Sequence, residues 1–149
     1  MWTYDAAGRK LGMTDANGNR TTYAYDGDDN VVSVVDPNGK TASFGYDAGN
    51  DLISVTDKNG SVTSYGYNQL GEVVSVASPA TSTITATYNP VGEVLTGTDA
   101  NGVVKHYGYD MAGRSTSISF PDASQNIVLS YDDGASQTGF LTGMTDPSG

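Results

Sequence analysis

Residues 25–45 read YDGDDNVVSVVDPNGKTASFG, a 21-residue stretch with two turn signals and two short runs of strand-forming residues. The tyrosine that opens it, followed by Asp or Asn, recurs through the chain at spacings of 21, 21, 21, 21, 21 and 22 residues. A fixed period over a whole sequence indicates one structural unit stacked on copies of itself. The repeats start near Tyr4, Tyr25, Tyr46, Tyr67, Tyr88, Tyr109 and Tyr131.

Each repeat has one turn signal directly after the tyrosine and a second one ten or eleven residues later. Examples are DAAG at residues 5–8 and DPNG at residues 36–39. Asp favours the first position of a type I turn, Pro the second, and Gly adopts the positive φ that ends it. Pro37 excludes a type I′ turn at its site because its φ is fixed near −65°.

The runs between the turns alternate with period two, as strands do, for example VVSVV at 31–35 and TASFGY at 41–46. No stretch shows helical periodicity with caps. Strands joined by such short loops are antiparallel neighbours, and sheets twist. We therefore expect an all-β fold: an antiparallel meander of about fourteen short strands from seven 21-residue repeats, forming a curved and twisted β-ribbon.

The odd period constrains the register, because residues 21 apart should face the same way while paired residues share a face. One odd and one even loop per repeat would satisfy this. We assign the odd loop to Asp-x-Asn-Gly, a type I turn with a glycine bulge that pairs Asp15 with Asn19. The even loop is then the four residues after the tyrosine, which pairs Tyr23 with Val32.

This register sorts the side chains onto an apolar face and a small-residue face. We expect Ile53 and Tyr65 to be cross-strand neighbours on the apolar face, which should be buried, and Ser54 and Ser64 to point away. That face must be covered by the sheet curling on itself, by a second sheet or by another copy. The apolar face collects Leu11, Met13, Tyr23, Tyr25, Val32, Val34, Phe44, Tyr46, Ile53, Val55, Tyr65 and Tyr67, and the small-residue face collects Gly12, Thr14, Thr22, Ala24, Ser33, Thr41, Ser43 and Ser54.

Composition excludes several classes of function. The formal net charge is −10, with 17 acidic and 7 basic residues, so nucleic acid is not expected as a partner and an anionic membrane would repel the chain. The sequence has no Cys, hence no disulfide framework or thiolate site. No apolar run approaches the roughly 18 residues of a membrane span. The N-terminus lacks the basic flank and apolar core of a signal peptide.

The repeated unit resembles the Rhs repeat, also called the YD repeat. The resemblance rests on YDAAGR at residues 4–9, TDANG at 14–18 and TYAY at 22–25, a pattern that recurs seven times over essentially the whole chain. Arg follows the turn glycine at Arg9 and Arg114, but Glu72 and Glu93 stand there in two other repeats.

The resemblance implies a large secreted or cell-surface protein, such as bacterial Rhs toxins, wall-associated proteins, cocoon subunits of insecticidal toxin complexes, or animal teneurins. It implies a β-ribbon that spirals into a hollow shell, which in the toxins encloses an effector released by autoproteolysis. We expect residues 1–149 to form a single array that is a segment of a larger protein. The self-cleaving core with paired Asp residues has no counterpart here, and residues 146–149 read as an ordinary turn, so no catalytic residue is carried over.

We expect no catalytic, cofactor-binding or metal-binding residue. His106 is the single histidine, and the register places it on the small-residue face as an ordinary surface residue. Asp15-x-Asn17-x-Asn19 is similar to the start of a calcium loop but lacks Gly at its sixth position and Glu at its twelfth. Weak calcium binding at the tips 28–29 and 132–133 stays an alternative. Nothing supplies the burial that a carboxylate pair in a glycosidase needs.

The expected role is a structural repeat scaffold, part of an encapsulating shell or an extended surface, with no hydrolase activity and no self-cleavage. Its partners would be other parts of a larger polypeptide or other copies of itself. One alternative is an adhesin-like module that binds a glycan or a protein through loop tips, the small-residue face or the tyrosines. Another is a subunit of a β-filament, since terminal strands at 1–4 and 141–145 would pair with other strands or fold back.

Overall fold

The computed structural model describes residues 1–132 and 139–146, and it confirms an all-β chain of fourteen strands with a single 3₁₀ turn. Two compact units divide the chain: unit 1 is Met1–Thr81 and unit 2 is Ser82–Gly149. In each unit, the strands are antiparallel and their order across the sheet is their order along the chain. No helix among the described residues has the length and apolarity needed to span a bilayer.

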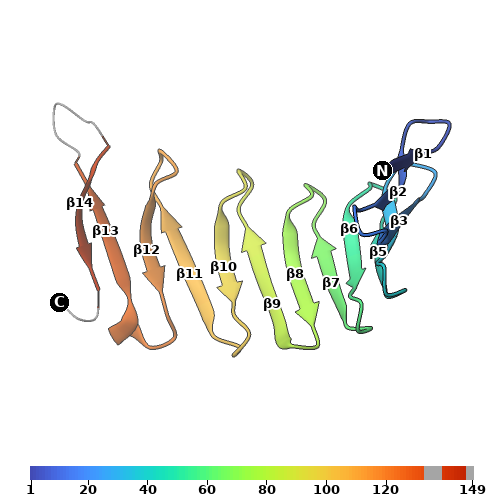
Figure 1. Cartoon of the computed structure of the whole chain (residues 1–149). Helices are drawn as coiled ribbons and strands as arrows, with labels where there is room; N and C mark the ends of the chain where they lie inside the picture. The colour runs from blue at the N-terminus through green and yellow to red at the C-terminus, as the bar shows by residue number, and fades with distance from the viewer. Residues whose placement is uncertain (133–138, 147–149) are drawn as a thin grey trace. The chain divides into compact units, whose positions relative to one another are not determined.

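Unit 1 is a meander of eight strands, each joined to the next by a short turn (Figure 1). From β2 to β7, strands of five and six residues alternate, as expected when each repeat supplies two strands. The strands are β1 Trp2–Tyr4, β2 Lys10–Thr14, β3 Arg20–Tyr25, β4 Val31–Val35, β5 Thr41–Tyr46, β6 Leu52–Thr56, β7 Val62–Tyr67 and β8 Val73–Ser78.

Unit 2 continues the pattern with six strands and one insertion. The residue added to the sixth repeat is accommodated by the 3₁₀ turn η1, Ala123–Gln125, where the side chain of Asp122 accepts a hydrogen bond from the backbone N–H of Ser124. The strands are β9 Thr81–Tyr88, β10 Val94–Thr98, β11 Val104–Tyr109, β12 Ser115–Ser119, β13 Ile127–Tyr131 and β14 Leu141–Thr145.

The hairpins closed by Asp-x-Asn-Gly have the expected register. Ser54 lies opposite Ser64 in β6 and β7, and the same register continued by one residue places Ile53 opposite Tyr65. The backbone N–H of Asp15 donates to the carbonyl of Asn19 at 3.0 Å, which gives the odd loop.

The loop after the tyrosine differs from the expectation, and the pairing of Tyr23 with Val32 is wrong. The backbone N–H of Asp26 donates to the carbonyl of Asn30 at 3.0 Å, so this loop is odd as well. The register then shifts between Ala24 and Tyr25, and Tyr23 pairs with Val34. A regular repeat, such as the one starting at Tyr25, therefore has two odd loops and one bulge, and the extra residue of the bulge restores the odd period.

The bulge leaves one residue per repeat without a partner on the preceding strand, while a small residue faces it across the ladder. In β6 the skipped residue is Ile53, beside the pair of Gly45 with Ser54. A Cβ on Gly45 would lie 2.5 Å from Ser54 Oγ, so the serine side chain fills the space left by the glycine. Comparable shifts occur at Leu11, Val32, Val74, Leu95, Thr116 and Thr142.

The two faces are sorted as expected. Phe44 pairs with Val55 and Tyr65 with Val76 on the apolar face, whereas Ser43 pairs with Thr56 on the small-residue face. Beyond the bulge the pairing differs from the expected register by two residues, so those side chains keep their faces. Between the bulge and the turn the difference is one residue, and Val31 pairs with Tyr25 on the face of the tyrosines.

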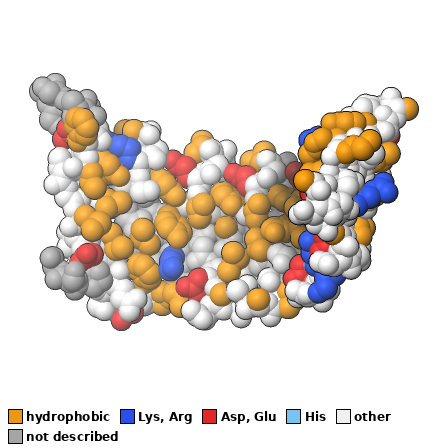
Figure 2. All heavy atoms as spheres, in the orientation of Figure 1, with side chains coloured by type: hydrophobic (Ala, Val, Ile, Leu, Met, Phe, Trp, Pro, Cys, Tyr) orange, Lys and Arg blue, Asp and Glu red, His pale blue; other side chains and the backbone are white. Residues whose placement is uncertain are grey.

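The apolar face is not buried, contrary to the expectation. Among the described residues no hydrophobic side chain is fully buried. Leu11, Ile53 and Leu95 occupy the same position in repeats that are 42 residues apart, and they are 38%, 38% and 41% exposed. Figure 2 shows hydrophobic side chains gathered on one face over the strands of unit 2. Each unit is a single layer, so its apolar side chains pack only against neighbours in the same sheet.

The corrected register can be tested with an engineered disulfide. We expect Tyr23→Cys combined with Val34→Cys to form a cross-strand disulfide under mild oxidation, because directly opposed Cβ atoms lie roughly 4.5–5.5 Å apart. The chain has no other Cys to compete. The matched control, Tyr23→Cys with Val32→Cys, represents the even loop. Mass spectrometry measures disulfide formation in both double variants. If the control forms the disulfide and the first pair does not, the bulge is absent.

Candidate functional site: the turns, the tyrosines and the apolar face

Ten turns in the described chain close in the same way, through the side chain of their first residue. In the turn at residues 15–19, Asp15 Oδ1 accepts hydrogen bonds from the backbone N–H groups of Asn17 at 2.8 Å and Asn19 at 2.9 Å. Gly18, with φ of 84°, donates its N–H to the Asp15 carbonyl at 3.2 Å. The same side-chain pattern begins at Asp5, Asp26, Asp36, Asp47, Asp57, Asn68, Asn89, Asp99 and Asp110.

These hydrogen bonds favour the ionised carboxylates. The pKa of Asp15 lies below its ordinary value, because the Asn19 amide donates to Oδ2 and the backbone N–H of Asn19 donates to Oδ1. The pKa of Asp99 is lowered by the backbone N–H groups of Val103 and Asn101. A carboxylate whose pKa is lowered on folding stabilises the fold above its unfolded value of about 3.9, and this contribution is lost as the pH falls through the lowered pKa.

The same geometry accounts for the residues that resemble a calcium loop. Both carboxylate oxygens of Asp15 accept hydrogen bonds from within the turn, so Asp, Asn and Gly are explained by turn closure. At the next tip, Asp29 Oδ1 accepts from Arg9 at 2.7 Å. Within residues 1–132 and 139–146, no three metal-ligating side chains lie together. The other candidate tip includes Asp133, which lies outside the described residues.

In most of the described turns that follow a tyrosine, the fifth residue complements the first. Where the first residue is Asp, the fifth is Arg in two turns: Arg9 Nε donates to Asp5 Oδ2 at 2.7 Å, and the equivalent contact at Asp110 is 2.6 Å. Where the first residue is Asn, the fifth is Glu, and the amide of Asn68 donates to Glu72 at 2.6 Å. Glu72 and Glu93 are thus not arbitrary departures from Arg, because donor and acceptor have exchanged positions together.

One turn lacks such a complement. Asp47 and Asp51 occupy its first and fifth positions, so two carboxylates stand where the other turns place a donor and an acceptor. The equivalent positions in the preceding turn hold Asp26 and Asn30, whose amide donates to Asp26 Oδ2 at 3.1 Å. Backbone N–H groups that donate to Asp47 therefore stabilise the turn at 47–51, while the like charges of Asp47 and Asp51 destabilise it.

Two turns use a strained backbone to link neighbouring repeats. Asp29 and Asn50 replace glycine at the fourth position and have φ of 68° and 66°, which non-glycine residues rarely adopt. Both side chains make contacts that glycine lacks: Asp29 accepts from Arg9, and Asn50 Oδ1 accepts from the Asn30 amide at 2.8 Å. The sequence signal was the missing glycine, which the sequence prediction did not use.

In several repeats the tyrosine of the YD signal seals the bulge of the preceding strand. The Tyr46 hydroxyl donates to the Val31 carbonyl at 3.1 Å, and the Tyr67 hydroxyl donates to the Leu52 carbonyl at 2.9 Å. Each acceptor directly precedes the skipped residue of the bulge, where the regular ladder is interrupted. We call these bonds the tyrosine ladder; its further members are Tyr25 with Lys10 and Tyr131 with Ser115.

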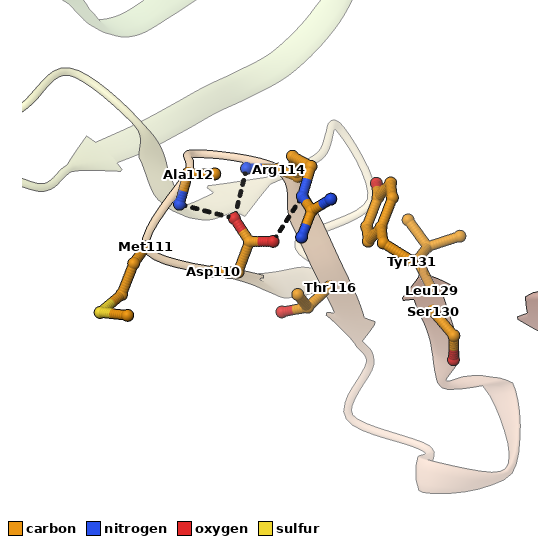
Figure 3. A pocket seen from close by; sticks show the side chains of 8 residues that line it. All are labelled: Asp110, Met111, Ala112, Arg114, Thr116, Leu129, Ser130 and Tyr131. Carbon is orange, nitrogen blue, oxygen red and sulfur yellow. Dashed lines mark hydrogen bonds and ion pairs between the residues drawn. The ribbon is translucent and has the colours of Figure 1, made fainter. Parts of the chain in front are cut away.

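A hollow of about 480 Å³ in unit 2 shows how the arginine and the tyrosine combine (Figure 3). The Arg114 guanidinium lies 4.4 Å from the centre of the Tyr131 ring while its Nε donates to Asp110. Arg9 stacks on Tyr25 in the same manner at 5.0 Å. The hollow is lined by Asp110, Met111, Ala112, Arg114, Thr116, Leu129, Ser130 and Tyr131.

His106 occupies the surface position expected for it. It is exposed in β11 and pairs with Thr96 and Ser119, on the small-residue face. No acid–base role follows from these neighbours.

The comparisons with known proteins identify the family. The RHS Repeat family model matches residues 4–41, 25–56, 46–83 and 88–125. The chain belongs to the RHS-repeat family. The repeats of this RHS chain form a structural scaffold. A search of curated protein sequences finds no match.

Three solved structures share the fold of this RHS chain. One is a mutant of the Photorhabdus luminescens Tc holotoxin pore, with 18% identity and a TM-score of 0.60. The others are TcdB2-TccC3-Cdc42 and TcdB2-TccC3 without its hypervariable C-terminal region, each with 18% identity and a TM-score of 0.54. Each match covers 95% of this chain and 10% of the other, so the chain spans about a tenth of their length.

The complementary turn positions generate the first prediction for this site. We expect Asp51→Asn to raise the melting temperature by about 1–2 °C, because it replaces a like-charge pair with the donor found at Asn30. The converse variant, Asn30→Asp, should lower it by a larger amount, because it creates a like-charge pair and also removes the hydrogen bond from the Asn30 amide to Asn50. A melting temperature that moves the same way in both variants would contradict the pairing; thermal unfolding followed by circular dichroism measures it.

The tyrosine ladder generates the second prediction. We expect Tyr46→Phe to reduce the free energy of unfolding by about 0.5–1.5 kcal/mol, because the Val31 carbonyl loses its donor while the ring stays in place. Tyr65→Phe is the control, since no hydrogen bond of the Tyr65 hydroxyl occurs among residues 1–132 and 139–146. Denaturant unfolding measures the free energy of unfolding of both variants. An equal decrease in the two would contradict a specific contribution of the tyrosine ladder.

Proposed function

We propose that this chain is a wall segment of a larger secreted or cell-surface RHS-repeat protein, where it forms part of an encapsulating β-shell or an extended surface. It has no chemistry of its own in this role. The whole chain, residues 1–149, acts as one array that continues into further repeats of the same polypeptide.

The observation that carries this proposal is the sheet without a core. Each unit is one layer, and the hydrogen-bonding groups that recur in every repeat are used to close turns and seal bulges. A sheet that leaves its apolar face half exposed is suited to being one wall of a larger structure. The chain covers 10% of the solved proteins that share its fold, which agrees with a segment of such a wall.

An adhesin that stacks sugars on tyrosines fits these contacts less well. Tyrosine hydroxyls such as those of Tyr46 and Tyr67 donate to backbone carbonyls of the neighbouring strand. The Tyr25 and Tyr131 rings, whose hydroxyls do the same, also lie against arginines. The rings are therefore engaged in holding the sheet. Specific, saturable binding on a glycan array would favour the adhesin over the scaffold.

The size of the native polypeptide tests the proposal. An antibody raised against this chain should detect, in the medium or at the surface of the source cells, a polypeptide many times larger than 15.5 kDa. Antibody depleted with the purified chain provides the control for specificity. Detection of a 15.5 kDa product alone, or of an intracellular product alone, would contradict the proposal.

A further inference from the structure

The chain exposes more surface than a compact protein of its mass. Its accessible surface is 9588 Å², whereas a compact monomer of 15.5 kDa exposes about 7,200 Å². The excess is roughly 2,400 Å², which is the scale of a stable protein interface. Because hydrophobic side chains contribute to this excess, covering them would be favourable.

Unit 1 presents a surface of sufficient size for such an interface. Its eight strands, spaced about 4.8 Å apart and about 17 Å long, give an apolar face of roughly 650 Å². Two such faces in contact would bury roughly 1,300 Å² in total, within the range of specific interfaces.

Cations lie at the β1–β3 end of this face, where Lys10, the partner of Tyr4, lies over the Trp2 ring and Arg9 lies over the Tyr25 ring. The paired positions in the rest of the face carry no charge. Its ladder runs through Tyr23 with Val34, Phe44 with Val55, and Tyr65 with Val76, while the acidic residues of unit 1 lie in the turns. A face that meets its own copy must avoid opposing like charges, because the same patch is present on both sides. The paired positions of this face in β3–β8 meet this condition. The net charge of −10 on each copy opposes the association at low salt.

The opposite face offers no comparable surface. Its central row consists of Gly45, Ser54, Ser64 and Ala77, side chains with little apolar area. We propose that two copies of this chain associate in solution through the apolar faces of their units 1, stacked face to face as two sheets. This association is a property of the chain beyond its role as a wall segment.

Ile53 is the side chain with which to test the interface. It is the skipped residue of its bulge and is 38% exposed within the single chain. We expect the wild-type chain to be dimeric by sedimentation equilibrium over a wide range of concentrations. Ile53→Glu should weaken the dimer at least about tenfold, because it places a charge in the interface of both copies.

Ser43→Glu is the matched control, since it adds the same charge to an exposed position on the small-residue face. It should leave the dimer unchanged, and far-UV circular dichroism should show that both variants keep their strands. Leu11→Glu, the equivalent of Ile53 two repeats earlier, provides a second variant and should weaken the dimer as well. Added salt should tighten the wild-type dimer by screening the acidic turns.

Three results would overturn the proposal. The first is a wild-type chain that stays monomeric at every concentration and salt level, which would assign the apolar face to another occupant such as the rest of a longer polypeptide. The second is a dimer that Ile53→Glu and Ser43→Glu affect equally, as expected for pairing through strand edges. The third is a dimer that only Ser43→Glu weakens. The size of the native polypeptide is measured independently, so the wall-segment proposal does not fail with this one.

Discussion

The closure of the turns by their first side chain is the interaction on which the rest of the fold depends. An Asp or Asn oxygen that accepts two backbone N–H groups fixes a five-residue turn with a positive φ at its fourth residue, as at Asp15 and Gly18. A regular repeat contains two such odd turns, as at Asp26 and Asp36, and two odd turns alone would require an even period. The bulge is the consequence, because one extra residue per repeat returns residues 21 apart to the same face.

The bulge in turn explains the other recurring residues. It interrupts the ladder, and the carbonyl before the skipped residue accepts a hydroxyl from the next tyrosine, as Val31 does from Tyr46. A small residue must face the bulge, because Gly45 leaves the room that the Ser54 side chain occupies. The tyrosine, aspartate, glycine and serine of a repeat therefore serve one connected arrangement. A repeat such as the one starting at Tyr46 closes its own turns and seals the bulge of the repeat before it.

The sequence predicts the parts of this arrangement that leave a local pattern. Asp and Gly three residues apart indicate turns, and alternation indicates which residues share a face. Ile53 and Ser54 were therefore assigned to opposite faces correctly. The bulge leaves no pattern of its own. The odd period of the repeat is compatible with two arrangements: one odd and one even loop, or two odd loops and one bulge. The hydrogen bond from the Asp26 N–H to the Asn30 carbonyl shows that the second arrangement is the one present.

Burial and the links between turns were harder to predict for a different reason. Alternation shows that Ile53 and Phe44 lie on the apolar face, but it carries no information about whether a second layer covers that face. The links of Asp29 and Asn50 depend on contacts about 20 residues away, although a non-glycine residue at a position with positive φ was a usable signal.

A sheet of this kind gains stability in small, repeated increments. Each strand contacts only its neighbours, so its side chains are half buried in the layer and every repeat adds similar turn, bulge and tyrosine contacts. Because each contact is local, one repeat can change its residues without affecting the others. The exchange of the Asp5–Arg9 pair for the Asn68–Glu72 pair is an example. The same locality leaves the apolar face uncovered, because nothing within a one-layer repeat turns back over it. The surface available for assembly thus follows from the way the sheet is held together, and no separate binding motif is needed to create it.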